Sequence, residues 1–160
     1  MHQDKYGNPF TATLNGILDL FRKKERVGRL DDGLRMDGKT CLITGANSGL
    51  GFAVAQQMAQ RGARVLMACR SGIPEAGEAV RRASGNPDVH MLPVDLSRRA
   101  SIEALVEALK ARGERLDVVV FNAAMVPGGS RRTEDGFDAM FMVNYLAKFI
   151  LANALIEKGL

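Results

Sequence analysis

The sequence predicts an α/β fold in which helices cover both faces of a doubly wound parallel sheet. Short apolar runs alternate along the chain with longer segments of helical periodicity, and the runs are apolar at successive positions. Such runs are typical of strands that are buried on both faces of a parallel sheet. Right-handed crossovers then make this a doubly wound layout, for which the expected order of the four strands is 3-2-1-4. The 160 residues, 46% of them apolar, suffice for one soluble globular domain.

Four apolar runs and four helical segments make up this pattern. The predicted strands are 40–44, 64–69, 89–94 and 117–121. The predicted helices are 50–61, 74–82, a helix marked by Ile102, Leu105, Val106 and Leu109, and 137–156. This order leaves the fourth strand at an edge, where we expect a second copy or a partner chain to cover it. The face of the last helix with Met140, Phe141, Leu146 and Ile150 gives the same expectation.

Residues 1–37 form a predicted lead-in to the domain 38–160. Apolar residues recur at helical spacing from Phe10 to Phe21, and a basic cluster follows at 22–26. Two interpretations stay open: the amphipathic helix packs on the domain or on a partner subunit, or residues 10–26 lie on a membrane surface. The chain has no signal-peptide pattern and no run near 18 consecutive apolar residues, so we expect a cytoplasmic protein.

Composition weighs against several classes of function. The net charge is +4, but the basic residues are scattered among acids, and no basic run is interleaved with aromatic residues as in a nucleic-acid groove. Cys41 and Cys69 lie far apart in apolar runs and follow no metal-binding spacing. We therefore expect a reduced protein that binds neither nucleic acid nor a structural metal.

The first strand-to-helix turn carries the clearest chemical signal. Thr44-Gly-Ala-Asn-Ser-Gly-Leu-Gly51 follows the first strand, and a helix opens at once. Gly45 allows a sharp turn, Gly49 lets the backbone approach a pyrophosphate, and Gly51 allows close helix–strand packing. Free N–H groups at the start of the helix then face the phosphates. The turn predicts nucleotide binding through Gly45, Asn47, Ser48, Gly49, Leu50 and Gly51; a merely structural turn is the alternative.

Several motifs in order resemble those of the short-chain dehydrogenase/reductase family, whose domain has a Rossmann-type fold. They are Thr44-Gly-x-x-x-Gly-x-Gly51, Met67-Ala-Cys-Arg70, Asp95-Leu-Ser, Asn122-Ala-Ala, Thr133-Glu-Asp-Gly-Phe and Val143-Asn-Tyr-Leu-Ala-Lys-Phe149. Together they are most similar to the retinol dehydrogenase and protochlorophyllide reductase branch. The resemblance covers 38–160 and implies an incomplete NAD(P)-binding domain, which stops before the C-terminal strands of the family.

The end of the second strand indicates which dinucleotide binds. An acid there would accept hydrogen bonds from the adenosine ribose hydroxyls, whereas a cation pairs with a 2′-phosphate. Cys69 stands where the acid is expected and Arg70 follows. This favours NADP(H) over NAD(H). If Arg70 is only a solvated surface residue, the preference is weak.

The resemblance implies further cofactor contacts after the third and fourth strands. Asp95, with Leu96, would bind adenine through its amino group, although a helix capped by Ser97 is the plainer role of this segment. Asn122, Ala123 and Ala124 would line the cofactor at the crevice where open parallel sheets bind ligands. Close backbone approach is less assured at Ala124, because most relatives have glycine there.

Asn144 is the one predicted catalytic residue. By resemblance it would hold a water in the proton relay; the alternative is a buried amide that bonds to a neighbouring backbone. The family also needs a Tyr-x-x-x-Lys pair, which the sequence lacks, since Tyr145 and Lys148 are three apart. The resemblance implies an oxidoreductase that moves hydride between NADP(H) and an apolar alcohol or carbonyl substrate. The alternative is a non-catalytic dinucleotide-binding module or an inactive fragment.

Overall fold

The structure, a computed structural model, describes residues 13, 31 and 33–160. The chain divides into a unit Met1–Gly33 and a unit Leu34–Leu160, and the fold described below is that of the second unit. Apart from Thr13, the predicted helix 10–21 and the proposed membrane-contacting segment 10–26 lie outside the described residues. The lead-in 1–37 therefore stays a prediction.

A four-stranded parallel sheet forms the centre of the unit Leu34–Leu160. Its strands are β1 (Thr40–Thr44), β2 (Arg64–Cys69), β3 (Val89–Pro93) and β4 (Val118–Val120). They lie in the order β3-β2-β1-β4, which confirms the predicted topology and places β4 at an edge. All three strand pairs are parallel. The strands therefore all end at the same edge of the sheet, where loops from distant parts of the sequence meet.

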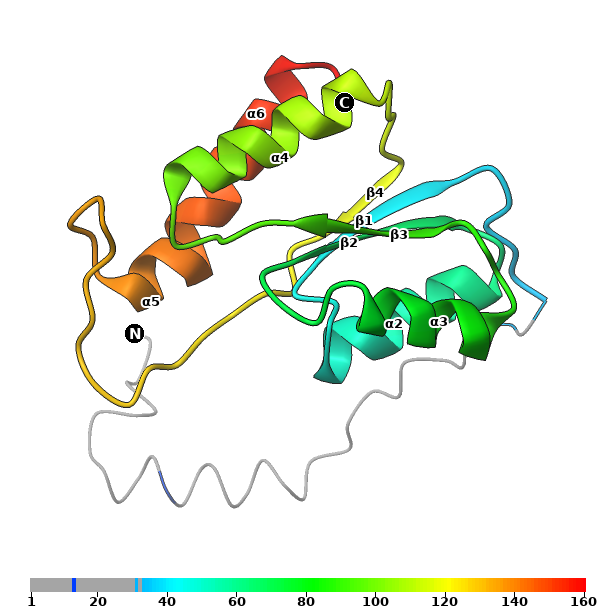
Figure 1. Ribbon diagram of the computed structural model, residues 1–160, viewed down its shortest axis with the longest axis horizontal. Coiled ribbons are helices and arrows are strands. Elements are labelled where there is room, and N and C mark those ends of the chain that lie inside the picture. The colour runs from blue at the N-terminus through cyan, green and yellow to red at the C-terminus, as the bar shows by residue number, and fades with distance from the viewer. Residues whose placement is uncertain (1–12, 14–30, 32) are drawn as a thin grey trace, which may run out of the picture. The chain divides into compact units, whose positions relative to one another are not determined.

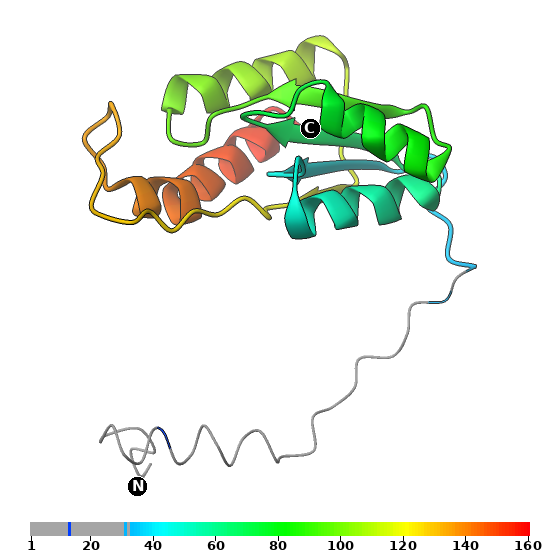
Figure 2. The same ribbon diagram turned by 60° about the horizontal axis from the view of Figure 1, so that its bottom comes forward.

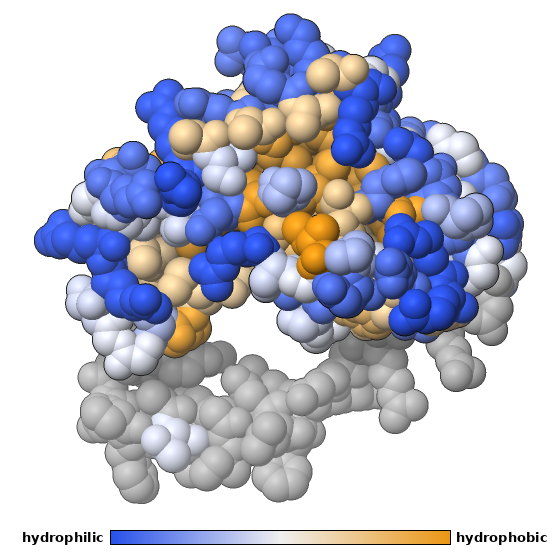
Figure 3. Space-filling view, viewed as in Figure 1, coloured by the Kyte–Doolittle hydropathy of each residue, from blue (hydrophilic) through white to orange (hydrophobic). Residues whose placement is uncertain are grey.

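Helices cover both faces of the sheet, as the alternating pattern predicts (Figures 1 and 2). On one face lie α2 (Gly49–Gln60) and α3 (Glu75–Ser84). On the other lie α4 (Arg99–Ala111) and α6 (Ala147–Glu157). In the view of Figure 3, hydrophobic side chains show between the two helix layers, while hydrophilic ones cover the outside of the helices.

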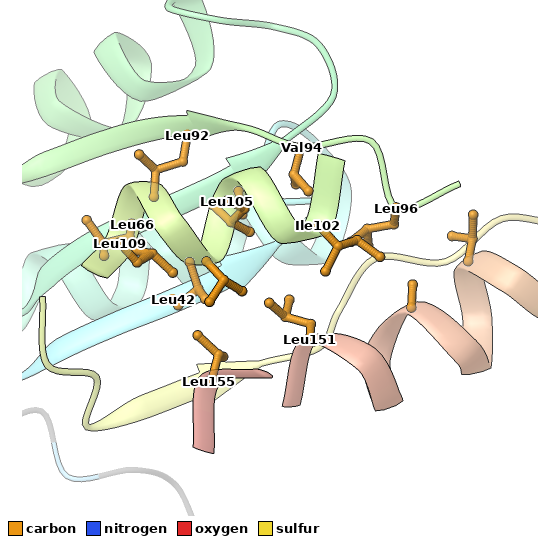
Figure 4. Close-up of a cluster of buried hydrophobic side chains, with 14 of the residues drawn as sticks. Leu42, Leu66, Leu92, Val94, Leu96, Ile102, Leu105, Leu109, Leu151 and Leu155 are labelled. Atoms are coloured by element: carbon orange, nitrogen blue, oxygen red, sulfur yellow. The ribbon is translucent and has the colours of Figure 1, made fainter. Parts of the chain in front are cut away.

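Alternate strand residues enter two separate cores. Leu42, Leu66 and Leu92 point toward α4 and α6, where they join a cluster of leucine and isoleucine side chains (Figure 4). Their neighbours Cys41, Val65 and other odd-numbered residues of β1 and β2 face α2 and α3. Each fully buried aliphatic side chain contributes about 2 kcal/mol of burial free energy. The two cores hold the sheet between its helices and fix where the strands end.

The last helical segment starts later than predicted and is not regular. It consists of α5 (Ala139–Phe141), a π-helical turn η1 (Met142–Leu146) and α6. Asp138 ends the preceding loop because its carboxylate accepts the Phe141 N–H at 2.9 Å as an N-cap. By length and mean hydropathy, 1.6, Ala139–Glu157 could cross a membrane. Core helices of globular proteins pass the same test, and α6 buries its inner face against the sheet.

The exposed face of this helix differs in part from the prediction. Leu146 and Ile150 pack partly against the core, because they lie beside the buried row of Ala147 and Leu151. Aromatic side chains on the opposite side are exposed instead, with Tyr145 at 63% and Phe149 at 59%. The prediction was right for Met140 and Phe141 and wrong for Leu146 and Ile150. Whether a partner covers this face stays a prediction.

The amino-terminal ends of the strands are held by an ion-pair network. The Arg64 guanidinium at the start of β2 donates two hydrogen bonds to the Glu114 carboxylate, at 2.7 and 3.0 Å. It also pairs with Asp88, whose carboxylate lies 2.7 Å from His90 Nε2. Glu114 is buried, with 7% of its surface exposed, and hydrogen bonding to it raises the pKa of Arg64. The network ties β2 to β3 and to the turn after α4.

Candidate functional site

A cleft of about 370 Å³ lies at the carboxyl ends of the strands. Its walls come from the turn after β1, the ends of β2 and β3, and the segment after β4. Open parallel sheets bind ligands in a crevice at this edge. The residues that line the cleft are Gly45, Asn47, Ser48, Ala68, Cys69, Arg70, Ser71, Val94, Asp95, Leu96, Asn122, Ala123, Ala124, Met125 and Val143.

Most of the predicted cofactor residues come together in this cleft. Gly45, Asn47 and Ser48 line it from the first turn, and Arg70, Asp95, Leu96, Asn122, Ala123 and Ala124 line it from the later strand ends. Gly49, Leu50 and Gly51 form the start of α2 directly after Ser48, but do not line the cavity itself. Asn144 also lies outside the lining, although its neighbour Val143 belongs to it.

The three glycines of the turn meet different constraints. Gly45 has φ of +65°, and a Cβ there would lie 2.9 Å from the Ala123 Cα. A Cβ at Gly51 would collide with the Gly45 carbonyl oxygen and the Asn122 side chain. Gly49 has φ of +55° but nothing within 4 Å of the position of a Cβ. The first and third glycines thus allow close packing, while the second leaves the backbone open to a ligand.

Asn122 fastens the turn to the end of β4. Its Nδ2 donates to the carbonyl oxygens of Thr44 and Gly45, each at 3.1 Å. The buried hydroxyl of Thr44 accepts the N–H of Ala123 at 3.1 Å. These bonds fix the β1 turn against the segment that lines the opposite wall. The side chain of Asn122 therefore holds the site together.

The start of α2 fits the phosphates of a dinucleotide. Its N-cap is Ser48, which makes no side-chain capping bond among the described residues, so the first N–H groups of the helix are left to solvent or a ligand. Ser48, Gly49 and Leu50 are all exposed, Leu50 to 73%. Together with the open space at Gly49, this donor set suits an anion at the positive end of the helix dipole.

The end of β2 places a cation beside a neutral thiol. Arg70 is exposed and lines the cleft, whereas Cys69 is buried to 1% exposure. Burial raises the pKa of the Cys69 thiol, and hydrogen bonds from the backbone amides of Ala46 and Asn47 oppose this rise. Cys69, at the position where an acid would bind the ribose hydroxyls, is thus uncharged at neutral pH. Asn47 also donates to the Ser71 hydroxyl at 3.4 Å.

Asp95 is held by its own loop, and the predicted cap at Ser97 is wrong. Ser97 donates both its N–H and its hydroxyl to Asp95 Oδ1, at 2.9 and 2.7 Å, and so does not cap α4. The N-cap of α4 is Arg98, and the Asp95 N–H donates to Ser101. Since both of these bonds to the carboxylate use Oδ1, Asp95 is oriented at the cleft wall with Oδ2 outside this loop network.

Asn144 lies in the π-helical turn and pairs with a backbone segment of the cleft. Its Nδ2 donates to the Met125 carbonyl at 2.9 Å, and its Oδ1 accepts the Met125 N–H at 2.8 Å. This pairing matches the alternative interpretation, an amide that bonds to a neighbouring backbone. It also positions Met125, which lines the cleft. A role in a proton relay stays a prediction.

Sequence reasoning missed several lining residues: Ala68, Cys69 as a wall residue, Ser71, Val94, Met125 and Val143. Ser71 had a signal, because it directly follows Arg70 at a strand end where side chains turn toward the crevice. Met125 and Val143 had no such sequence signal, because an apolar residue that lines a cleft follows the same pattern as one in the core. Their presence adds apolar side chains to a lining that also holds polar ones.

Comparison with known proteins agrees with this geometry. The family model described as short chain dehydrogenase matches residues 39–158. Human retinol dehydrogenase 11 is 37% identical over 141 residues, 86% of this chain and 44% of that protein. Human retinol dehydrogenase 14 is 38% identical over 167 residues, 91% of this chain and 49% of that protein. The chain thus spans less than half the length of these curated relatives.

Solved structures show the same fold. RhlG of Pseudomonas aeruginosa, in an NADP active-site complex, superposes with a TM-score of 0.65 at 27% identity, over 79% of this chain and 50% of that one. L-Sorbose reductase of Gluconobacter frateurii, complexed with NADPH and L-sorbose, gives 0.64 at 25% identity, over 79% and 49%. With the family match over three quarters of the sequence and the cofactor turn in place, the chain belongs to the short-chain dehydrogenase family.

Proposed function

We propose that this chain binds NADP(H) as the cofactor-binding portion of an oxidoreductase that transfers hydride between the nicotinamide and an alcohol or carbonyl substrate. The observation that carries the proposal is the cleft at the carboxyl ends of the strands, which joins the open glycine turn, Arg70 and Asp95 in one cavity. Membership of the family supports the class of reaction. The dinucleotide, when bound, supplies or accepts the hydride.

The preference for NADP(H) follows from charge at the end of β2. Arg70 offers a guanidinium to a 2′-phosphate, and the neutral Cys69 offers no carboxylate to a ribose hydroxyl. Two structurally similar proteins were solved with NADP or NADPH, which supports the same choice.

The sequence sets an expectation for the 160-residue chain by itself. It contains no Tyr-x-x-x-Lys pair, which would supply a phenol with its pKa lowered by a nearby ammonium. We expect dinucleotide binding without steady turnover. A non-catalytic binding module is the second candidate, favoured by this missing pair. Alcohol-dependent reduction of NADP⁺ by the purified chain would contradict the expected lack of turnover and would exclude the non-catalytic module.

The substrate class rests on the relatives and on the apolar wall of the cleft. Curated relatives of this chain include proteins named retinol dehydrogenases, and Met125, Val143 and Val94 add apolar side chains to the lining of the cavity. An apolar alcohol or carbonyl compound is the substrate that we propose.

We propose further that the protein is cytoplasmic. A liposome co-sedimentation experiment tests this. Co-sedimentation that is lost when residues 1–26 are deleted would instead favour membrane contact through residues 10–26.

Titration of both dinucleotides tests the proposed function. Calorimetry on the wild-type chain should show NADP⁺ binding about tenfold or more tightly than NAD⁺, because a charged hydrogen bond to phosphate is among the stronger polar contacts. Arg70→Ala should bring the two affinities close together. Arg112→Ala is the matched control, since Arg112 is an exposed arginine at the end of α4 and does not line the cleft.

Two results would overturn the proposal. Absence of binding by the folded wild-type chain would remove the nucleotide site. An affinity ratio that Arg70→Ala leaves unchanged would show that Arg70 does not hold the 2′-phosphate.

A further inference from the structure

The loop between β4 and α5 is fixed where it begins, at the cleft, but not over the residues that follow (Figure 1). Both backbone polar groups of Met125, which lines the cleft, bond to the Asn144 amide, at 2.8 and 2.9 Å. Residues 126–130, which we call the gate, make no hydrogen bond with any part of the chain that the structure describes. Gly128 and Gly129 have nothing within 4 Å of the position of a Cβ. So few contacts are typical of segments that open and close over a binding site.

A tight turn follows the gate and closes on itself. The Thr133 N–H donates to the Phe137 carbonyl at 2.9 Å, and the Thr133 hydroxyl accepts the Phe137 N–H at 3.2 Å. The Ala139 N–H, at the start of α5, donates to the Arg131 carbonyl at 2.8 Å. These bonds make residues 131–139 one unit, so the side chains at its tip have a defined position at the far end of the gate.

Two acidic side chains of this turn bind the start of α4, and we call their two contacts the latch. Arg98 Nε donates to Glu134 Oε2 at 3.1 Å. Asp135 Oδ2 accepts the Arg99 N–H at 3.5 Å, where the positive end of the helix dipole favours a carboxylate. Leu96, which lines the cleft, lies shortly before Arg98. The latch therefore fixes the far end of the gate beside the opposite wall of the cleft.

The latch is exposed, so it can be removed without unfolding the chain. The side chains of Arg98 and Glu134 are 54% and 71% exposed. Ion pairs of this kind contribute little to the stability of a fold and are screened by salt. Their loss should change the position of the turn and leave the sheet and its two cores intact.

We infer that the gate closes over the cleft when the dinucleotide binds, and that the latch slows release of this ligand by fixing the far end of the gate. The inference rests on the proposed function, because the ligand is the one assigned to the cleft. Val126, the first gate residue, is 88% exposed although it directly follows Met125 in the lining. Closure would bury this apolar side chain against the ligand, which is favourable. Rotation at Gly128 and Gly129 permits closure, since no side chain opposes it there.

Hydrogen exchange with and without saturating NADPH tests closure in the 160-residue chain. The amides of residues 126–130 should exchange about tenfold more slowly with NADPH bound, because the closed gate is shielded from solvent. The turn 112–115 is the control, since it lies at the amino-terminal ends of the strands, and its exchange should not change. Equal exchange at the gate in a chain that binds NADPH would overturn the inference and leave the proposed function standing.

Stopped-flow fluorescence of NADPH release tests the latch. Glu134→Gln/Asp135→Asn should raise the dissociation rate constant about fivefold. Glu103→Gln is the matched control and should release NADPH at the wild-type rate, because Glu103 is an exposed carboxylate that pairs with Arg99 Nε at 2.8 Å inside α4. Arg98→Glu should also raise the rate, and Arg98→Glu/Glu134→Arg should restore it by rebuilding the pair with its charges exchanged.

Far-ultraviolet circular dichroism establishes that each variant is folded. If the double variant of the latch releases NADPH as slowly as Glu103→Gln does, the inference is wrong while the proposed function stands. The same holds if the exchanged pair releases NADPH as fast as Arg98→Glu alone. If the folded wild-type chain binds no NADPH, the proposed function itself fails, and the inference with it.

Discussion

The two ends of the parallel sheet treat their polar groups in opposite ways. At the amino-terminal ends of the strands, Arg64, Asp88 and Glu114 satisfy one another, and the Glu114 carboxylate is buried. At the carboxyl ends, the first N–H groups of α2 are left to solvent or a ligand, and Arg70 lines an open cavity. The polar groups at one end of the strands thus stabilise the fold, whereas those at the other end are left to bind a ligand. Substitutions should separate these two roles.

The largest expected effect comes from Gly51→Ala, which should reduce both the stability of the fold and the binding of the dinucleotide. Its methyl group would meet the Gly45 carbonyl, a backbone atom that cannot move cheaply. We expect a loss of about 3 kcal/mol in the free energy of unfolding, a decrease in Tm of roughly 6–12 °C, and loss of NADP⁺ binding. Thermal unfolding and calorimetry measure the two effects.

Gly49→Ala is the matched substitution within the same turn. A Cβ there has open space but a strained φ, so about 1 kcal/mol of stability should be lost. The loss in the free energy of NADP⁺ binding should exceed the loss in the free energy of unfolding. Equal stability losses in the two variants would contradict the difference that we assign to the two glycines.

Breaking the opposite end should reduce stability without changing binding. Arg64→Met leaves the buried Glu114 carboxylate without its cation, and we expect a loss of about 2 kcal/mol, discounted because Arg64 is partly exposed. The double variant Arg64→Met/Glu114→Leu should recover much of this loss. Urea unfolding measures stability, and NADP⁺ titration should give the wild-type affinity.

The control for this pair is Arg82→Met, which removes an exposed ion pair with Glu78 at 3.7 Å. Its effect should stay within about 0.5 kcal/mol. A tenfold loss of NADP⁺ affinity in folded Arg64→Met would show that the two ends of the sheet are coupled.

Asn122→Ala tests a polar side chain at the cleft that acts by holding its walls together. It removes the bonds to the carbonyl oxygens of Thr44 and Gly45. We expect about 1 kcal/mol less stability and a decrease in affinity of about tenfold for both dinucleotides alike. The ratio of NADP⁺ to NAD⁺ affinity should not change, in contrast to Arg70→Ala. A changed ratio would place Asn122 near the 2′-phosphate instead.

The smallest effect is a dependence on pH at Asp117, just before β4. The hydrogen bond from Lys39 and that from the Thr40 N–H lower the pKa of this carboxyl. A lowered pKa in the folded state stabilises the fold above the unfolded pKa, and this contribution is lost as the pH falls through the folded value. Asp117→Asn should therefore have a slightly lower Tm than wild type at pH 7. The gap should close at acidic pH, below the usual carboxyl range of about 4.

The sequence predicted best what depends on local pattern. The strands, the β1 turn and the placement of Arg70 at a strand end follow from apolar periodicity and glycine spacing, which are readable within about ten residues. The strand order follows from the doubly wound layout that the alternation of strands and helices predicts. The ion-pair network was not predicted, because Arg64, Asp88 and Glu114 are far apart in the chain and only the sheet brings them together. Ser97 was misassigned since a serine before a helix can bond equally well to a neighbouring carboxylate.

Asn144 illustrates the same limit at the candidate site. Its amide was singled out from an apolar helix, but its partner Met125 lies 19 residues away on a segment without a recognisable pattern. The irregular winding around it had no signal either, since the same residues suit a regular helix. Apolar wall residues such as Val143 are indistinguishable from core residues until the cavity is seen.

The π-helical turn Met142–Leu146 makes the effect of a one-residue deletion depend on where in the helix it falls. A wider turn holds one more residue than an α-helical turn does, so deleting one residue there would restore regular winding and leave the two flanking segments nearly in phase. The core face of α6 would be kept, and the irregular turn that holds Asn144 opposite Met125 would be lost. The same deletion within α6 would instead rotate everything beyond it by about 100° about the helix axis and turn its buried side chains out of the core.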